Sequence, residues 1–172
     1  MSADLAGIEI GRNVPMRSYT TLGIGGGADF LVKPRDANGL REAFAFCGAY
    51  GLPLNVIGKG SKLLVRDGGV RGVTAVMTRM NGISVNGTVV TVAGGAGLMR
   101  LSAVCAAAGL SGLEWAVGIP ASLGGAVFMN AGAYGGSMAD CVRSVTVFDG
   151  GGFLEIPARE CDFGYRASVF NG

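Results

Sequence analysis

A glycine-rich loop at residues 58–63 carries the residue types that bind phosphate groups. Its sequence, Gly-Lys-Gly-Ser-Lys-Leu, follows an apolar run at 54–57 that predicts a β-strand. Glycine frees the backbone so that successive N–H groups can form a concave anion site, and Lys59 and Lys62 add positive charge. An ordinary tight turn explains the loop equally well. The loop is not the phosphate loop of nucleoside triphosphatases, because Gly60 follows Lys59 where Ser or Thr is required.

Two further glycine-rich segments, 118–125 and 130–136, contain no charged residue. Uncharged, glycine-rich segments of this kind can wrap a large flat ligand at van der Waals distance. Ser122, Asn130 and backbone amides would then provide the polar contacts. Close packing of helices against glycine is the alternative. A glycine cluster at 23–28 matches the letters of the dinucleotide fingerprint, but a strand follows it where a helix is required. A Rossmann fold is therefore excluded.

The composition excludes several functional classes. The chain has 172 residues, of which 49% are hydrophobic and 15% are charged, and this balance indicates a folded protein rather than a disordered one. It contains no His, which excludes Ser–His and Cys–His nucleophiles and His-ligated metal, and we expect no metal site. A net charge of +2 provides no basic stripe for nucleic acid.

Cysteine usage and hydropathy indicate a cytosolic protein. No C-x-x-C pair is present, and we expect buried, reduced thiols at Cys47, Cys105, Cys141 and Cys161. The N-terminus has acidic residues where a signal peptide has basic ones, and no apolar core. Glu114 is the only charge between Arg100 and Asp140, but Pro120 and the many glycines there argue against a bilayer helix. We expect no membrane span, and we expect this segment to be buried against an apolar ligand or core.

The elements that position these segments fall into two groups. Residues up to 28 are expected to be irregular. A strand at 28–32, a helix from Asp36 to Gly51 and a strand at 54–57 form a strand–helix–strand unit, which predicts parallel strands, and a third strand is expected at 72–77.

After Arg79 the pattern changes to hairpins. We expect one hairpin from 83–85 and 88–92 around Asn86-Gly87, a helix at 97–108, and a second hairpin from 144–148 and 153–156. The sequence therefore predicts a small α/β lobe at 1–78 followed by an α+β lobe at 79–172.

Seven motifs then occur in a characteristic order. They are Tyr19-Thr-Thr-Leu-Gly-Ile-Gly-Gly26, Gly58-Lys-Gly-Ser-Lys-Leu-Leu-Val65, Asp67-Gly-Gly-Val-Arg-Gly72, Gly112-Leu-Glu114, Gly118-Ile-Pro120, Asn130-Ala-Gly-Ala-Tyr-Gly135 and Gly164-Tyr-Arg-Ala-Ser168. Together they resemble the UDP-N-acetylenolpyruvoylglucosamine reductase family over residues 19–170.

The resemblance implies an α+β, two-lobed FAD-binding fold of the vanillyl-alcohol-oxidase (PCMH) type. It also implies a cytoplasmic oxidoreductase of peptidoglycan precursor biosynthesis, and hence of cell wall biogenesis, cell shape and cell division. In the family reaction, NADPH reduces bound FAD, and a hydride then passes to the enolpyruvyl double bond. UDP-N-acetylglucosamine enolpyruvate, a small-molecule nucleotide sugar, thereby becomes UDP-N-acetylmuramate.

The family's functional residues can be transferred to matching positions. The loop that holds the FAD pyrophosphate corresponds to Gly58, Lys59, Gly60, Ser61, Lys62 and Leu63. The residues that line the rest of the cofactor correspond to Gly118, Ile119, Pro120, Ala121, Ser122, Gly124, Gly125, Asn130, Gly132, Ala133 and Tyr134. Arg166 corresponds to the catalytic arginine, which stabilises charge on the enolpyruvyl carboxylate, and Tyr165 and Arg166 are expected to contact substrate.

Three departures from the family pattern bear on function. The family usually has Asn at the position of Lys62 and Gly at that of Ala121. The family chain also continues into a substrate-binding domain with the proton-donating serine, a role that does not belong to Ser168. We expect this domain to be absent, so that the chain supplies the FAD-binding part and self-associates through the face left open.

Two alternatives stay open at this point. One is a stand-alone FAD-binding module without reductase activity. The other is a different oxidase or dehydrogenase of the same flavin fold, which would reduce its flavin with a small alcohol or acid.

Overall fold

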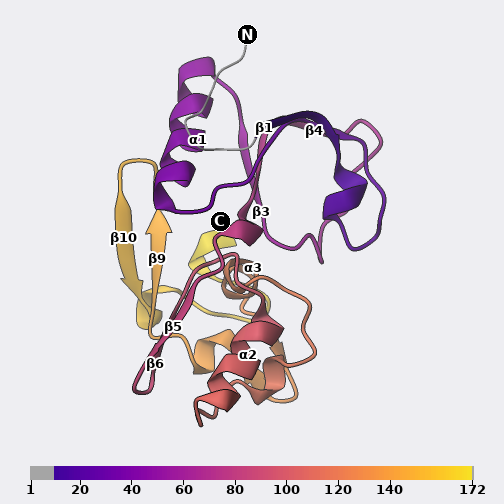
Figure 1. Cartoon of the computed structure of the whole chain (residues 1–172). Helices are drawn as coiled ribbons and strands as arrows, with labels where there is room; N and C mark the ends of the chain where they lie inside the picture. Colours follow the sequence, from indigo (N-terminus) through magenta and orange to yellow (C-terminus); the bar gives the residue numbers. More distant parts are fainter. Residues whose placement is uncertain (1–9, 172) are drawn as a thin grey trace. The chain divides into compact units, whose positions relative to one another are not determined.

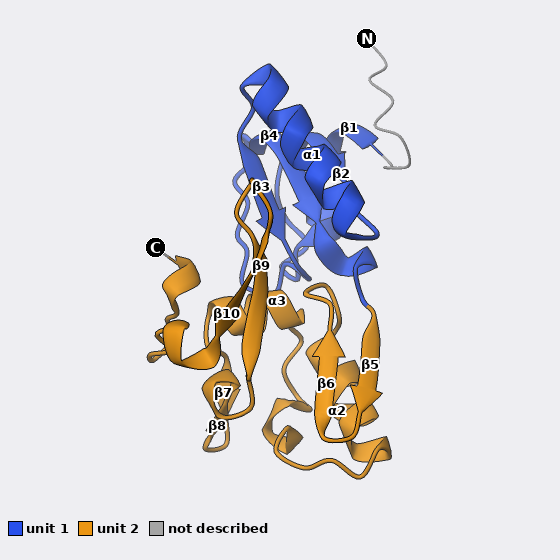
Figure 2. Cartoon of the chain, turned by 90° about the vertical axis from the view of Figure 1, so that its left-hand side faces the viewer, with its two compact units in different colours: residues 1–81 blue, residues 82–172 orange. Residues whose placement is uncertain are grey.

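The computed structural model describes residues 10–171, and these residues divide into two compact units, residues 1–81 and 82–172 (Figure 2). Each unit has its own core. The described residues form short helices and both parallel and antiparallel strands, which confirms the α+β class. No helix in the described part of the chain is long and apolar enough to cross a bilayer.

Unit 1 is built on a four-stranded sheet with the order β1-β2-β4-β3 (Figure 1). The strands are β1 (Ile10–Pro15), β2 (Gly27–Val32), β3 (Leu54–Ile57) and β4 (Val70–Val76). β4 pairs in parallel with both β2 and β3, so the predicted crossover is confirmed, with β4 inserted between its two strands.

Helix α1 (Ala37–Tyr50) covers one face of this sheet. The Asp36 side chain accepts the N–H of Gly39 at 2.9 Å, and Gly51 ends the helix in the left-handed conformation, as both ends were predicted. Ala43 and Cys47 of the helix pack on Val32, Val73 and Ala75 of the sheet. The opposite face is covered by Met16, from the short 3-10 helix η1 (Met16–Tyr19), and by Val65.

The expectation of an irregular N-terminal segment is wrong for residues 10–19 and falls outside the described residues for 1–9. Ile10–Pro15 forms edge strand β1, antiparallel to β2, although its central residues Gly11, Arg12 and Asn13 are polar or small. An edge strand faces solvent on its open side and needs only a neighbour's hydrogen-bonding groups, so its sequence carries little apolar signal.

The described residues of unit 2 form three two-stranded antiparallel sheets and two α-helices around one core. Its strands are β5 (Ile83–Asn86), β6 (Val89–Val92), β7 (Gly132–Ala133), β8 (Gly136–Ser137), β9 (Ser144–Phe148) and β10 (Phe153–Pro157). Its helices are α2 (Leu98–Ala107) and α3 (Leu123–Phe128). The core combines Leu98, Leu101 and Cys105 of α2 with Trp115, Ala116, Ala126, Val127 and Met138.

The three elements predicted for this unit are present, with one correction. Asn86 pairs with Val89, so the turn of the β5–β6 hairpin is Gly87-Thr88 rather than Asn86-Gly87. Gly87 has φ +57, and this left-handed position, which glycine tolerates, sets the register one residue later. α3 and the β7–β8 hairpin were not predicted, because their glycine-rich sequences lack both helical and strand periodicity.

Candidate flavin and carboxylate site

The loop after β3 combines a tight turn with exposed positive charge. The N–H of Leu63 donates to the carbonyl of Gly60 at 3.4 Å, and that carbonyl also accepts the N–H of Thr21 at 3.2 Å. Gly60 has φ +67, and its Cα faces the Tyr19 carbonyl so closely that no Cβ would fit. Glycine is therefore required here for both conformation and space.

The same loop presents donors for an anion. Among the described residues, the main-chain N–H groups of Lys59, Ser61 and Lys62 have no hydrogen-bond partner. The side chains of Lys59 and Lys62 are exposed. Successive amides of this kind, flanked by ammonium groups, suit phosphate oxygens, so the residues present fit a pyrophosphate. The tight turn is thus present, and it is compatible with an anion site.

The segment 118–125 is partly committed to packing within unit 2. The N–H groups of Leu123 and Gly124 donate to the carbonyls of Ala96 and Gly94 at 2.8 and 2.7 Å, and Ser122 is only 3% exposed. Gly124 approaches Gly94 closely, which is the packing role considered as an alternative for these glycines. The partly buried Ala121 side chain packs against the unit's core. Gly118, Pro120 and Gly125 are exposed.

Two tight turns of unit 2 carry non-glycine residues in the left-handed region. Tyr134-Gly135 connects β7 to β8 with φ values of +51 and +86, where Asn-Gly is the preferred pair. Arg166 has φ +55 in the turn that Gly164 and Ala167 close by a β-bridge. Tyr134 and Tyr165 are 95% and 93% exposed, so neither aromatic ring is held by packing. Strained, exposed residues of this kind concentrate at functional sites.

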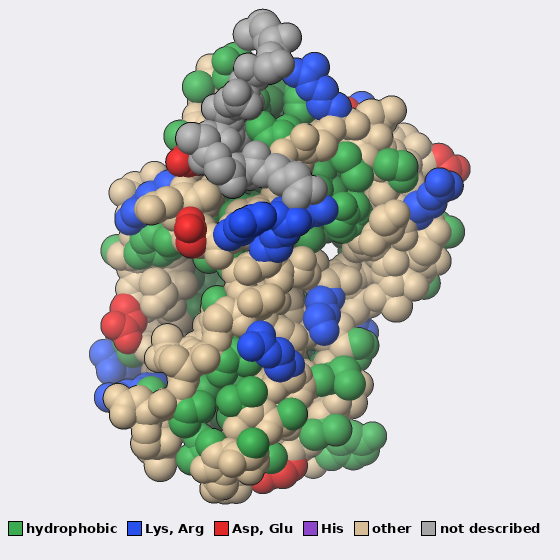
Figure 3. Space-filling model, in the orientation of Figure 1, with side chains coloured by type: hydrophobic (Ala, Val, Ile, Leu, Met, Phe, Trp, Pro, Cys, Tyr) green, Lys and Arg blue, Asp and Glu red, His purple; other side chains and the backbone are tan. Residues whose placement is uncertain are grey.

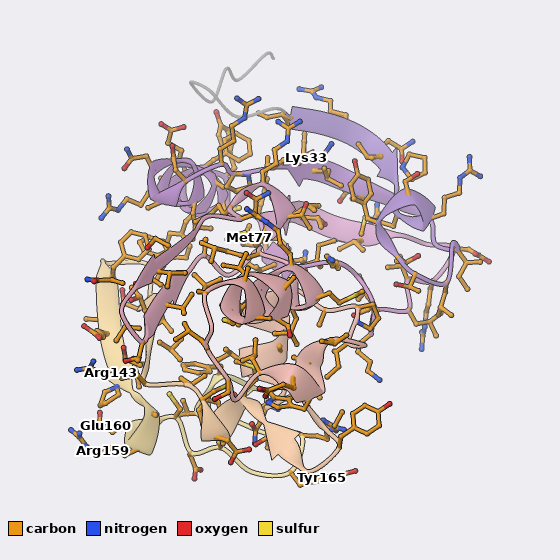
Figure 4. All side chains as sticks on the ribbon, turned by 60° about the horizontal axis from the view of Figure 1, so that its bottom comes forward. Lys33, Met77, Arg143, Arg159, Glu160 and Tyr165 are labelled. Carbon is orange, nitrogen blue, oxygen red and sulfur yellow. The ribbon has the colours of Figure 1, made fainter. Side chains whose placement is uncertain are left out.

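Both turns line one pocket of about 380 Å³ within unit 2. The pocket brings together the predicted residues Asn130, Gly132, Ala133, Tyr134, Tyr165 and Arg166, with Gly135, Gly136, Ser137 and Gly164 completing the wall. Figure 4 labels Tyr165, whose side chain points away from the ribbon. The predicted residues 118–125 do not line this pocket, and those at 58–63 belong to unit 1.

Arg166 is the cationic group of this pocket. Its Nη2 donates to the carbonyl of Gly132 at 3.1 Å, and its Cζ lies 5.5 Å from the centroid of the Tyr165 ring. The remaining N–H groups of the guanidinium have no partner among the described residues, and the side chain is exposed. A guanidinium with free donors in a fork can bind a carboxylate through two parallel hydrogen bonds.

Ser168, in the same motif, has a structural role. It is 8% exposed, its Oγ donates to the carbonyl of Phe128 at 2.7 Å, and the same Oγ accepts the N–H of Phe170 at 3.3 Å. A largely buried hydroxyl group with both of these bonds is poorly placed to donate a proton to a ligand.

The charge around the pocket is low. Unit 2 contains four of the 14 basic residues, namely Arg100, Arg143, Arg159 and Arg166. On the face drawn in Figure 3, basic side chains lie at several separate places and do not form one continuous stripe. The described residues contain no group of three or more His, Cys, Asp or Glu side chains that could hold a metal ion.

One of the four cysteines is not buried as the sequence predicted. All four are free, but only Cys47, Cys105 and Cys161 are buried, and Cys141 is exposed. Its Sγ nonetheless turns back onto the carbonyls of Ser137 and Met138, at 3.7 and 3.5 Å. Burial of the sulfur and then the neighbouring Asp140 carboxylate raise the pKa of the Cys141 thiol from 9.0 to about 11. At neutral pH the thiol is therefore protonated and unreactive.

Three structural features of the site were missed from the sequence. Gly136 packs against Trp115, Gly164 closes the Arg166 turn, and Ser137 and Asp140 form a reciprocal capping box after β8. The Ser-x-x-Asp spacing in the sequence could have indicated the capping box. The other two depend on contacts between distant segments.

The chain matches a known family over most of its length. Residues 28–155 match the family described as an FAD binding domain. UDP-N-acetylenolpyruvoylglucosamine reductase from Lactiplantibacillus plantarum is 44% identical over 168 residues, which cover 97% of this chain and 56% of that protein. The chain thus spans little more than half the length of the curated relatives it matches.

Solved structures agree with this similarity. The crystal structure of UDP-N-acetylenolpyruvylglucosamine reductase from Thermus caldophilus is 39% identical, with a TM-score of 0.78, over 94% of this chain and 56% of that one. Aclacinomycin oxidoreductase is 20% identical, with a TM-score of 0.62, over 87% of this chain and 33% of that one, and it shows the shared fold alone. The predicted two-lobed flavin fold is thereby confirmed.

Proposed function

The chain belongs to the FAD-binding domain family, and from this premise we propose that it forms the flavin-binding part of a UDP-N-acetylenolpyruvoylglucosamine reductase. The proposed reaction is the NADPH-linked reduction of UDP-N-acetylglucosamine enolpyruvate to UDP-N-acetylmuramate, in the cytoplasm, for peptidoglycan synthesis and hence cell shape and division. The observation that carries the proposal is the position of Arg166, with free donors, in a pocket beside the glycine-rich 132–136 hairpin.

The residues proposed to bind FAD would do so through two kinds of chemistry. In unit 1, the N–H groups of Lys59, Ser61 and Lys62 would bind the pyrophosphate, with the two ammonium groups offsetting its charge. In unit 2, the exposed backbone at Gly118, Pro120 and Gly125, and the 132–134 strand and turn, would lie against the cofactor's rings. When bound, FAD supplies the hydride.

Arg166 would bind and orient the enolpyruvyl carboxylate. Reduction of the double bond by a hydride places negative charge beside this carboxylate, and a guanidinium anchored on the Gly132 carbonyl would stabilise that charge. Tyr165, whose ring centroid lies 5.5 Å from the Arg166 Cζ, would contact the substrate. The proton that completes the reduction must come from another group, because the Ser168 hydroxyl is buried and bonded to Phe128.

This division of roles predicts a partial activity. The chain spans 56% of its relatives, and we propose that the proton donor and most of the nucleotide-sugar site belong to the remainder. We also propose that the chain associates with another copy of itself through the face that carries the exposed Tyr134 and Tyr165 side chains. A stand-alone FAD-binding module is the second candidate, because the hydroxyl group of Ser168, in the Arg166 motif, is bonded to the Phe128 carbonyl.

The absorption spectrum tests the proposal. The purified chain is mixed with FAD, desalted and scanned, then treated anaerobically with NADPH and afterwards with UDP-N-acetylglucosamine enolpyruvate. We expect a retained flavin spectrum that NADPH bleaches. Retained flavin that NADPH leaves oxidised supports the stand-alone module, and bleaching by a small alcohol or acid instead supports a different oxidase. A chain that retains no flavin contradicts the proposal.

A further inference from the structure

Asn130 joins two segments of unit 2 that are 34 residues apart in sequence. Its Nδ2 donates to the carbonyl of Gly164 at 2.8 Å. Its Oδ1 accepts the N–H of Ala139 at 3.0 Å. Each end of the amide therefore has a partner inside the protein, which fixes the orientation of the side chain.

The Gly164 carbonyl is the acceptor that closes the Arg166 turn. It accepts the N–H of Ala167 at 3.3 Å, while the N–H of Gly164 donates to the carbonyl of Ala167 at 3.0 Å. Between these reciprocal bonds lie only Tyr165 and Arg166. The Gly164 carbonyl, which accepts one of the two bonds that close this turn, thus also accepts the side-chain bond from Asn130.

The guanidinium is anchored on the same segment as the turn. Arg166 donates to the carbonyl of Gly132, two residues after Asn130. The backbone turn that carries Arg166 is therefore bonded to Asn130, and the Arg166 side chain is bonded to Gly132. A bidentate contact with a carboxylate needs this double fixation, because an exposed arginine otherwise samples many rotamers.

The residue type at position 130 suits this task. Asn130 has φ +40, a left-handed conformation in which Asn is several-fold enriched among non-glycine residues. Its short amide reaches one acceptor and one donor at the same time. Glycine would satisfy the backbone but provide no link to Gly164.

We propose that Asn130 is a positioning residue that orients Arg166 for carboxylate binding, and that it does not bind the cofactor through its amide. The inference rests on the proposed function only for the identity of the carboxylate. The link from Asn130 to the Arg166 turn is a property of unit 2 itself, and it can be tested without any ligand.

The test uses Asn130→Asp in the full chain. Aspartate tolerates the left-handed conformation and still accepts the N–H of Ala139, but an ionised carboxylate cannot donate to Gly164. Asn86→Asp, an exposed position in β5, is the matched control for the added charge. Hydrogen exchange of the 164–167 amides, followed by mass spectrometry, reports on the turn.

We expect these amides to exchange at least tenfold faster in Asn130→Asp than in the wild type at pH 7.5, with no change in Asn86→Asp. The affinity for FAD should stay within about twofold. Binding of UDP-N-acetylglucosamine enolpyruvate should weaken at least tenfold. Unchanged exchange at 164–167 would overturn the inference, as would a parallel loss of FAD, which would place Asn130 at the cofactor or in general folding.

A pH series separates positioning from simple structural damage. The new carboxylate would face the Gly164 carbonyl oxygen, which disfavours its charged form, and the protonated carboxyl can again donate. The exchange ratio of variant to wild type should therefore fall at least threefold from pH 7.5 to pH 5, and a ratio independent of pH contradicts the inference. If the wild type binds neither FAD nor the enolpyruvyl compound, the proposed function fails, and the exchange data alone decide the role of Asn130.

Discussion

Gly136 packs against the indole ring of Trp115, and an added Cβ would overlap Cδ1 and Cγ of that ring. Trp115 is 9% exposed, its Nε1 donates to the carbonyl of Gly112 at 3.1 Å, and it belongs to the core of unit 2. The β7–β8 hairpin, which carries Tyr134, is thereby attached to the core through a glycine. A change at Gly136 in the pocket wall should consequently also affect the stability of unit 2.

Gly136→Ala should destabilise unit 2 by about 1–3 kcal/mol, because the ring has no free space into which it could move. Trp115 is the only tryptophan, so its fluorescence during urea unfolding measures the loss directly. Gly152→Ala is the matched control, since a Cβ at Gly152 meets nothing within 4 Å, and we expect a change below about 0.5 kcal/mol. Equal stabilities of the two variants would disprove the packing argument.

The double substitution Lys59→Ala, Lys62→Ala should weaken FAD binding about tenfold and reduce its dependence on salt. Both ammonium groups flank the free amides of the 58–63 loop, and exposed charges act on a phosphate over a short, screened range. The affinity can be measured by quenching of flavin fluorescence between 50 and 500 mM NaCl. Arg35→Ala removes an exposed cation elsewhere in unit 1 and should leave the affinity unchanged. An equal effect of the control would point to general electrostatic attraction.

Arg166→Lys should weaken binding of the enolpyruvyl compound about a hundredfold, while FAD binding is retained. Lysine keeps the charge and the same backbone cost at φ +55, but it lacks the planar fork of donors. Arg159→Lys, in the surface ion pair with Glu160 that Figure 4 labels, controls for the substitution itself. Titration calorimetry on the FAD-loaded proteins distinguishes the variants, and full affinity in Arg166→Lys would remove the proposed role.

Thr74→Val should stabilise unit 1 by about 1 kcal/mol. Thr74 is fully buried in β4, and its Oγ1 has no hydrogen-bond partner among the described residues. Valine has the same shape and carries no hydroxyl group to leave unsatisfied. The midpoint of thermal unfolding measures the effect, and Thr146→Val, at an exposed position of β9, should change little. Destabilisation by Thr74→Val would mean that a partner for this hydroxyl exists.

Cys141 should react with iodoacetamide about a hundredfold more slowly at pH 8 than an unstructured cysteine peptide, because a pKa of about 11 leaves far less thiolate than an ordinary value of 9.0. The rate plotted against pH should rise toward a midpoint near 11. Since the unfolded thiol ionises first, the free energy of unfolding should also fall between pH 9 and 11, and Cys141→Ser should remove that part of the fall. A midpoint near 9 would contradict the shielded position of the sulfur.

Local signals in the sequence predicted much of the fold. Asp36 and Gly51 delimit α1 because capping depends on neighbours within a few residues. The strands around Gly87 and around 149–152 follow from alternation and turn chemistry. The 58–63 loop was identified as a turn from its glycines, and the turn is present; its use as an anion site stays a prediction.

The sequence by itself therefore determined the α+β class, the family and most element boundaries, because each depends on short-range periodicity or on an ordered set of motifs. Only the tertiary structure decided which of the glycine-rich residues meet. It brought Asn130 to Gly164, Gly60 to the Tyr19 carbonyl and Gly136 to Trp115, and it committed Ser168 to Phe128. These are contacts between distant segments, where a glycine or a short polar side chain has no periodic signal, and their geometry depends on how the whole unit packs.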